Sequence, residues 1–330
     1  MTIRFCQRVS ALVLPLLIAG ILTQASQAAA QSFPSQSIRI VVPASAGTPP
    51  DIISRLVAAE LSKKEGWRVI VENKIGAMQM MAGAEVLKQP ADGHTMVAFS
   101  LPSMVAPHLL QNMTIQLEAD FVPVIKVATS YNVLVVHPSV QANSVSELVT
   151  LLKSNPDKLT FSSGGFGTPA HLAGELFKVQ TGVRATHVPY QQFPQAIADL
   201  LGGTNQYMFI NTLPVIDLIS TGKLRALAVT APRRIAALKD VPTVVESGHP
   251  DLVVQDWAAY FVKKDTPKEI VAKLNDALNQ VLAQTSVQDA FAKLGAEPAG
   301  GTTAELGSFV GSQLTYWAKV VKASGMKMHQ

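Results

Sequence analysis

The chain has 330 residues, of which 48% are hydrophobic and 15% are charged, with a formal net charge of +4 and a single cysteine. This length and apolar fraction can fill the core of one large domain or two ordinary ones, which excludes intrinsic disorder. The single cysteine excludes a disulfide scaffold or zinc ribbon, and the scattered Lys and Arg residues do not form the basic stripe of a nucleic-acid-binding protein.

The amino-terminal segment has the pattern of a secretory signal. Two arginines precede an apolar stretch over residues 11–22, and a polar segment then ends in three alanines. A membrane anchor is the alternative, but the stretch is shorter than the ~20 residues of a span and is interrupted by Pro15. We therefore expect a cleaved signal peptide over residues 1–30, which removes Cys6, and a soluble product outside the cytoplasm that needs no oxidative folding.

The chain after this segment begins with a strand–helix–strand pattern. A β-branched run over residues 37–43 ends at a Gly/Pro-rich loop, and residues 51–64 then carry apolar residues at helical spacing. A second strand pattern over residues 68–72 follows Gly66. This spacing predicts an α/β fold with parallel pairing, and the same alternation returns from Ser144 onward.

Helix starts are predicted where a Ser or Thr is followed three positions later by Glu, the capping-box pattern. The pairs are Ser144 with Glu147, Thr266 with Glu269, and Thr302 with Glu305. After the last two pairs, apolar residues within 270–281 and 306–317 predict two carboxy-terminal helices, each with one buried face.

Two extended segments predict a division into two lobes. Residues 121–136 and 252–262 are rich in Val, Tyr and Phe without helical period, and the first is two to three times the usual ~5–6 residues of a strand. They bracket further strand patterns at 158–162, 184–188, 206–210 and 224–230. We expect one lobe over 31–130 with 255–330 and a second over 131–254, joined by two crossing strands; a single continuous domain is the alternative.

Two loops that lead from a strand into a helix form the candidate binding site. The first runs from Pro43 to Pro50, and the second from Ser162 to Thr168. Small residues there allow backbone N–H groups to point outward at a helix amino terminus, where unpaired donors and the helix dipole favour an anion. Ligands of open α/β sheets bind at such strand ends. Neither loop has the lysine of a nucleotide-phosphate loop, so we expect a carboxylate held by both; an ordinary βα turn is the alternative for each loop alone.

Other chemistries have weaker signals. Gly165, Gly167 and Ala170 fit the loose dinucleotide pattern, but the next strand pattern ends without an acidic residue for a ribose, so we expect no cofactor. Ser163 and His171 are not part of a G-x-S-x-G elbow, and an exported hydrolase therefore remains only as the rival enzyme hypothesis. The histidines lack the spacing of a zinc site, so we expect neither a metal nor catalytic residues.

Many ordered segments also match one known family. They are IRIVVP at 38–43, Gly47, Asp51, VEN at 71–73, Gly76-Ala77, Asp92-Gly93, and the segments 164–168, 171–177, 187–190, 199–203, 222–230 and 240–243. From Ser37 to about Lys322, the chain resembles the Bug family of periplasmic solute-binding proteins, the substrate-binding component of tripartite tricarboxylate transporters.

The resemblance implies a two-lobed type II periplasmic binding protein fold that closes on its ligand and is not an enzyme. It further implies a monomer that delivers a small organic carboxylate to the permease subunits of a membrane transporter. A ligand sensor that presents its closed form to a membrane signalling protein remains open, because the sequence has no recognisable docking motif.

Carried over residue by residue, the resemblance implies ligand contacts in both loops, at a third strand end and in the second lobe. These residues are Ser45, Ala46, Gly47, Thr48, Ser100, Leu101, Ser162, Ser163, Gly165, Phe166, Gly167, Thr168, Tyr190 and Asn211. The resemblance also implies that loop backbone amides hold the ligand carboxylates, partly through water.

Several positions depart from the family pattern. Thr48-Pro49-Pro50 replaces Gly-Gly-Thr, which stiffens the first loop and removes N–H donors. Met78-Gln79-Met80 replaces Gly-Gly-Asn, Gln191-Gln192 stands where Lys-Gly is common, and Ile210 stands where Asp is frequent. Loss of a cation and an acidic group, together with the added methionines, leads to the hypothesis of a larger or more apolar carboxylate, including an aromatic one.

Overall fold

The structure is a computed structural model that describes residues 33–190 and 193–326. The described residues from Ser37 onward form one compact unit. The expected signal peptide lies outside the described residues. In the part that is described, no helix is long and apolar enough to cross a membrane.

Strands and helices alternate along the chain, as an α/β fold requires. The strands are β1 (Ile38–Val42), β2 (Val69–Asn73), β3 (Thr95–Ser100), β4 (Phe121–Val136), β5 (Thr160–Ser163), β6 (Thr186–Pro189), β7 (Tyr207–Asn211), β8 (Arg225–Val229), β9 (Gln255–Lys263) and β10 (Ala296–Gly300). The α-helices are α2 (Pro49–Glu65), α3 (Met80–Leu87), α4 (Leu101–Leu109), α5 (Leu117–Asp120), α6 (Val145–Ser154), α7 (Pro169–Thr181), α8 (Phe193–Leu201), α9 (Ile216–Ser220), α10 (Lys268–Leu282), α11 (Thr285–Lys293) and α12 (Thr303–Ser324). Short 3₁₀ helices are η1 (Ala77–Gln79), η2 (Leu213–Val215), η3 (Ala236–Leu238) and η4 (Pro250–Leu252).

The predicted strand–helix–strand unit is confirmed. β1 pairs in parallel with both β2 and β3, and Arg39 of β1 donates from Nε to Glu72 of β2 over 3.1 Å. α2 begins at Pro49, two residues earlier than expected, because prolines fit the first turn of a helix, where no N–H partner is needed. It ends at Gly66, whose left-handed φ of 70° is the usual way to close a helix.

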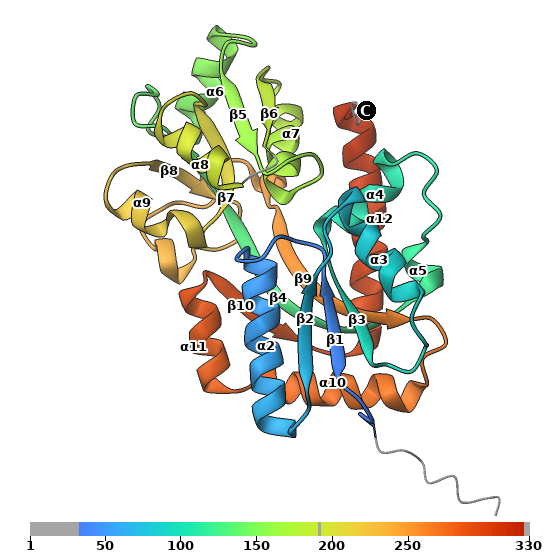
Figure 1. Cartoon of the computed structure of the whole chain (residues 1–330). Coiled ribbons are helices and arrows are strands. Elements are labelled where there is room, and N and C mark those ends of the chain that lie inside the picture. Colours follow the sequence, from blue (N-terminus) through green and yellow to red (C-terminus); the bar gives the residue numbers. More distant parts are fainter. Residues whose placement is uncertain (1–32, 191–192, 327–330) are drawn as a thin grey trace, which may run out of the picture. The chain divides into compact units, whose positions relative to one another are not determined.

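β4 connects the two halves of the sheet, as its length predicted. Residues 121–131 pair with β9, and residues 132–136 pair with β7 and β8. Figure 1 shows β4 running from the lower half of the molecule into the upper half. β9 begins at Gln255, later than the predicted 252, because η4 occupies the preceding residues. The exact lobe boundaries stay a prediction.

Neighbouring residues of β9 face opposite layers of helices. The ring of Trp257 contacts Phe309 of α12 with a centroid distance of 5.3 Å, whereas Tyr260, out of phase with it, faces Ser54 of α2. Figure 1 shows α2 in front of the sheet and α12 behind it. In the upper half, Phe177 of α7 packs on Phe209 of β7 at 5.7 Å. The sheet is therefore covered on both faces, as the parallel pairing requires.

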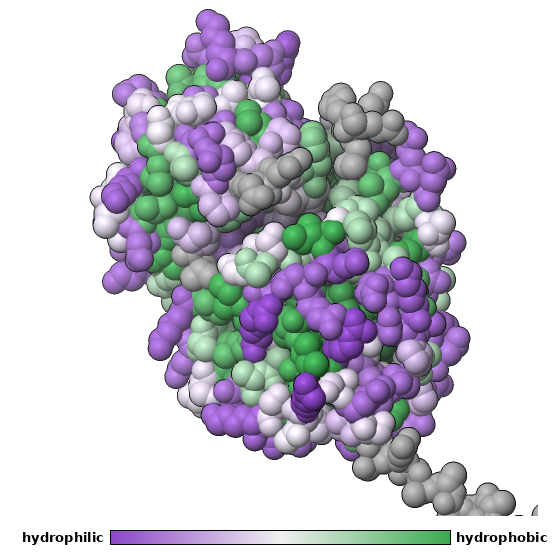
Figure 2. Space-filling model, viewed as in Figure 1, coloured by the Kyte–Doolittle hydropathy of each residue, from purple (hydrophilic) through white to green (hydrophobic). Residues whose placement is uncertain are grey.

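The surface between these elements is mixed. Figure 2 shows hydrophilic and hydrophobic residues interspersed over this face, and one of the hydrophobic areas lies near its middle, at the level where β1 and β2 end in Figure 1. This is the level from which the loops after β1 and β2 extend toward the upper half.

The predicted capping box at Thr302 is confirmed. At Ser144, only one of the two hydrogen bonds of a capping box forms. Thr302 Oγ1 accepts from the Glu305 backbone N–H at 3.1 Å, and Glu305 Oε2 accepts from the Thr302 N–H at 2.7 Å. Ser144 Oγ likewise accepts from the Glu147 N–H at 3.2 Å, but the Glu147 carboxylate accepts from the backbone of Asn143 instead of Ser144.

The third predicted capping box, at Thr266, is wrong. α10 begins one residue later than a Thr266 cap would allow, with Pro267 in the capping position. The Thr266 hydroxyl instead donates backward to the Lys263 carbonyl at 2.7 Å, which closes the turn after β9. A Ser or Thr hydroxyl next to a tight turn has this competing partner.

Replacement of Thr302 by Ala removes the hydroxyl half of the confirmed capping box. We expect the free energy of unfolding, measured by urea denaturation, to fall by about 1 kcal/mol. Thr302→Ser retains the hydroxyl and is the control. Equal stabilities of the Ala and Ser variants would contradict a contribution of the cap.

Candidate functional site

Asp51 organises the first loop. Its buried carboxylate accepts from the backbone N–H of Gly47 at 2.9 Å, from Arg55 Nε at 3.1 Å and from Asn73 Nδ2 at 2.8 Å. Asn73 Nδ2 also donates to the carbonyl of Ala44 at 2.9 Å. Burial opposes ionisation of Asp51, but the hydrogen bonds from Arg55, Gly47 and Asn73 outweigh it and lower the pKa of the carboxyl. Arg55 is therefore engaged by the protein itself.

Part of the predicted set of N–H donors in this loop is used internally. Gly47 donates to Asp51, and Thr48 donates from both its N–H and its hydroxyl to the carbonyl of Ser45, at 3.3 and 2.6 Å. Among the described residues, none accepts from the N–H groups of Ser45 or Ala46, and both residues are exposed. Of the four predicted residues, these two therefore offer free backbone donors.

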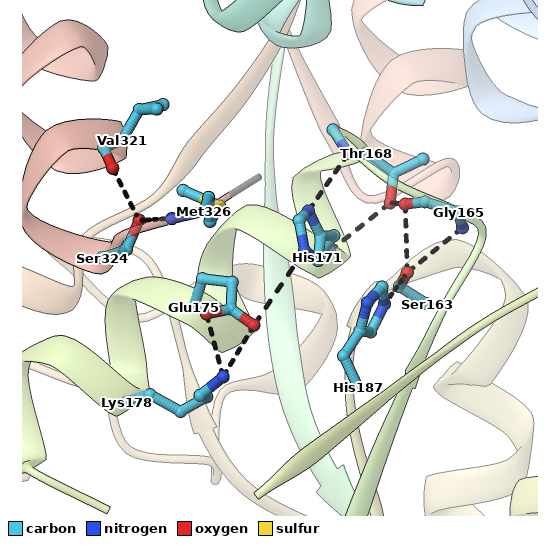
Figure 3. Close-up of polar contacts among 11 residues, drawn as sticks. Ser163, Gly165, Thr168, His171, Glu175, Lys178, His187, Val321, Ser324 and Met326 are labelled. Atoms are coloured by element: carbon cyan, nitrogen blue, oxygen red, sulfur yellow. Dashed lines mark hydrogen bonds and ion pairs between the residues drawn. The ribbon is translucent and has the colours of Figure 1, made fainter. Parts of the chain in front are cut away.

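The second loop is fixed by its own side chains (Figure 3). The N–H of Gly167 donates to His171 Nδ1 at 3.1 Å, and the N–H of Gly165 donates to Ser163 Oγ at 3.1 Å. Thr168 caps α7: its hydroxyl donates to the Gly165 carbonyl at 2.7 Å and accepts from the His171 N–H at 3.4 Å. These contacts leave the N–H of Phe166 without an acceptor among the described residues.

Two histidines, His171 buried and His187 half-buried, form an uncharged wall behind this loop. The rings of His171 and His187 lie 4.3 Å apart, and burial lowers the pKa of His171 to about 3 and that of His187 to about 4. Because Gly167 donates to Nδ1 of His171, the neutral ring carries its proton on Nε2, 4.0 Å from Glu175 Oε1. Glu175 is in turn paired with Lys178 at 2.9 Å.

Ser163 and His187 resemble the nucleophile and base of a catalytic pair. Ser163 Oγ lies 2.7 Å from His187 Nε2, a pairing that the sequence analysis did not predict. His187 Nδ1 is buried and has no partner among the described residues, so the carboxylate that orients the histidine of a triad is lacking there. The ring stacks on Phe161 at 4.8 Å, and its lowered pKa makes it a weak base. This pair fixes the loop.

The third strand end is occupied by Gln79, which sequence reasoning did not identify as a site residue. Ser100, the residue before α4, donates from its N–H to Gln79 Oε1 at 2.9 Å and accepts from Gln79 Nε2 at its hydroxyl. Leu101 is completely buried. One feature of the sequence pointed to this residue: Met78 and Gln79 stand where the family pattern has two glycines.

The two predicted contacts of the second lobe are tied to neighbouring elements. Tyr190 donates from its hydroxyl to Asp199 at 2.6 Å and accepts there from Asn205 at 2.7 Å. Asn211, at the end of β7, donates from Nδ2 to Ser130 Oγ at 3.1 Å. Their ligand contacts stay predictions, as does that of Ser162, whose buried hydroxyl has no partner among the described residues. Gln191 and Gln192 lie outside those residues.

A strained segment after β2 reaches the second loop. Ala77, Met78 and Gln79 have φ values of 45°, 48° and 79°, in the left-handed region that costs a non-glycine residue about 1–2 kcal/mol. The side chain of Met78 extends to Gly167, where a Cβ atom would lie 2.2 Å from its Cε. The described residues contain no cluster of three or more metal-ligating side chains.

Comparison with known proteins identifies the family of this chain. Residues 53–326 match the tripartite tricarboxylate transporter family receptor. The chain belongs to this family. It is 32% identical to BugT of Bordetella pertussis over 92% of this chain and 94% of that protein.

Two solved structures support the predicted fold. A protein of R. palustris with adipate shares 31% identity with a TM-score of 0.82, covering 89% of this chain and 99% of that one. MatC from Rhodopseudomonas palustris with bound malate shares 29% identity with a TM-score of 0.79, covering 88% and 100%. The family resemblance and the expected periplasmic binding protein fold are therefore confirmed.

Burial of His171 makes stability depend on pH. The pKa of His171 is lower in the folded chain than the ordinary 6.5, so its stabilising contribution is complete above pH 6.5 and is lost as the pH falls toward 3. His171→Asn retains an acceptor for the Gly167 N–H but does not titrate. We measure the unfolding free energy of this variant and of the wild type from pH 7 to 4. We expect that of the variant to fall less steeply than that of the wild type, with a difference in slope of about 1.4 kcal/mol per pH unit below the ordinary pKa of histidine.

The control for this measurement is His108→Asn, which changes an exposed histidine of α4. Its pH profile should follow that of the wild type. Parallel profiles for the His171→Asn chain and the wild type would contradict a neutral buried His171.

Proposed function

We propose that the chain is a periplasmic receptor that captures one small organic carboxylate between the loops before α2 and α7 and delivers it to the permease subunits of a tripartite tricarboxylate-type transporter. The observation that carries this proposal is the set of backbone donors at Ser45, Ala46 and Phe166, for which no acceptor exists among the described residues. The charged side chains beside them, Asp51 and Glu175, are already paired with Arg55 and Lys178.

These donors suit a carboxylate on physical grounds. Hydrogen bonds from N–H groups to an ionised oxygen are about twice as strong as neutral ones, and helix amino termini add a favourable dipole. A micromolar dissociation constant requires about −8 kcal/mol, which a few such bonds and some apolar contact can supply. A ligand that bridges both loops would favour the closed arrangement by its higher affinity for it.

The ligand's remaining part is proposed to be apolar, and an aromatic body fits this requirement. The two solved relatives described above hold adipate and malate, which are small dicarboxylates. In this chain, the second loop is backed by two neutral histidines and Phe166, and Met78 contacts Gly167. This wall offers contact to carbon atoms and has no free cation for a further carboxylate among the described residues.

Location and assembly follow from the same proposal. The amino-terminal pattern supports export with cleavage near residue 30, and we infer that the product acts as a monomer. Delivery to a membrane sensor instead of a permease would use the same ligand chemistry, so the two partners differ only in the docking surface.

Ligand class can be tested by thermal-shift measurements on the purified exported protein with mono-, di- and aromatic carboxylates. We expect the largest rise in Tm with an acid that has an apolar or aromatic body. Stabilisation by citrate or aspartate alone would contradict the proposed ligand class. Failure of every carboxylate would contradict the receptor function.

Gly167→Ala tests the second loop. The added methyl group would meet Met78 and push this flexible side chain into the space between the loops, so we expect carboxylate affinity measured by calorimetry to fall about tenfold or more. Gly182→Ala is the matched control, because Gly182 has a similar φ of 67° but open space around it. Equal affinity in the two variants would remove the second loop from the site.

A further inference from the structure

The segment after β2 is held in a conformation that its residues do not favour. Ala77, Met78 and Gln79 are three consecutive non-glycine residues with positive φ, and Gly76 before them has φ 137°. Glycine adopts this region readily, and other residues adopt it only where surrounding structure holds them there. Such strain at a strand end indicates that the side chains have a role that glycine could not fill.

Gln79 supplies the interactions that hold the segment. Its side-chain amide pairs with both the N–H and the hydroxyl of Ser100, and its backbone N–H donates to the Gly76 carbonyl at 3.0 Å. The side chain is only 8% exposed. This pairing uses the N–H of Ser100, which would otherwise be a donor for a carboxylate at the third strand end.

Met78 extends from this segment to the second loop. A Cβ on Gly167 would lie 2.2 Å from Met78 Cε and 3.2 Å from its sulfur, so the thioether lies directly on the backbone of Gly167. The ring of Phe166, the preceding residue, meets His171 and His187 edge-on at 5.3 and 5.2 Å. The surface that Met78 forms together with Phe166 and the two histidines is therefore apolar and uncharged.

The residues around Met78 continue this apolar character. Ile75 and Met81 are 59% and 46% exposed, and Met81 packs over Gly76. Figure 2 shows a hydrophobic area at the level where β2 ends.

We propose that Met78 determines the class of ligand: it occupies the space beside Gly167, so that the ligand presents one carboxylate to the loop N–H groups and an apolar end to Met78. This inference rests on the proposed receptor function. A second carboxylate at that end would be desolvated against a thioether without hydrogen-bond donors, which is unfavourable. An apolar end would gain contact with a side chain that adapts to irregular shapes.

Hexanoate and adipate test this role, because they differ only in whether the far end is a methyl group or a second carboxylate. The dissociation constants of both acids are measured by calorimetry for the wild type, Met78→Gly and Met81→Ala. Glycine at position 78 suits the backbone φ of 48°, so the Met78→Gly chain should fold, which its melting curve checks.

We expect the wild type to prefer hexanoate, and Met78→Gly to shift the ratio of the two constants toward adipate by about tenfold or more. Met81→Ala removes a neighbouring exposed methionine and should leave the ratio unchanged. If both the wild type and Met78→Gly bind the acids with the same ratio of dissociation constants, the role of Met78 is overturned, whereas the receptor function is not. Binding of neither acid by the wild type would contradict the receptor function as well.

Discussion

The arrangement of the site depends on the backbone hydrogen bonding of β4. The first part of this strand pairs with β9 and β10, and its last part pairs with β7 and β8, so that both halves of the sheet share it. Register shifts near Pro123, Lys126 and Leu134 show where the strand departs from regular pairing. Because β4 fixes the direction of its neighbours, the strand ends that carry the loops before α2 and α7 are positioned through it.

The electrostatics of the site are local. The two carboxylates beside the loops have partners within the protein: Asp51 pairs with Arg55, and Glu175 pairs with Lys178. The histidines behind the second loop are neutral, because burial lowers the pKa of both. The attraction for an anion therefore comes from backbone N–H groups at helix starts, which a net charge of +4 for the whole chain does not describe.

Sequence patterns predicted the features that depend on local residue order. The length of β4, the strand–helix–strand unit and the capping box at Thr302 all follow from periodicity and spacing. They could not predict that Ser163 pairs with His187, because these residues meet only through the parallel pairing of β5 with β6. The contact of Met78 with Gly167 was equally hidden, since it joins two loops that are distant in sequence and depends on a backbone conformation that methionine rarely adopts.

Native mass spectrometry of the protein purified gently from periplasmic extract identifies the molecule that the site holds, and it therefore tests directly whether the site binds a carboxylate. We expect one small molecule per chain, an organic acid with one carboxylate and an apolar body. A bound amine, sugar or phosphate ester would contradict it. So would a chain that carries no ligand and binds no added carboxylate.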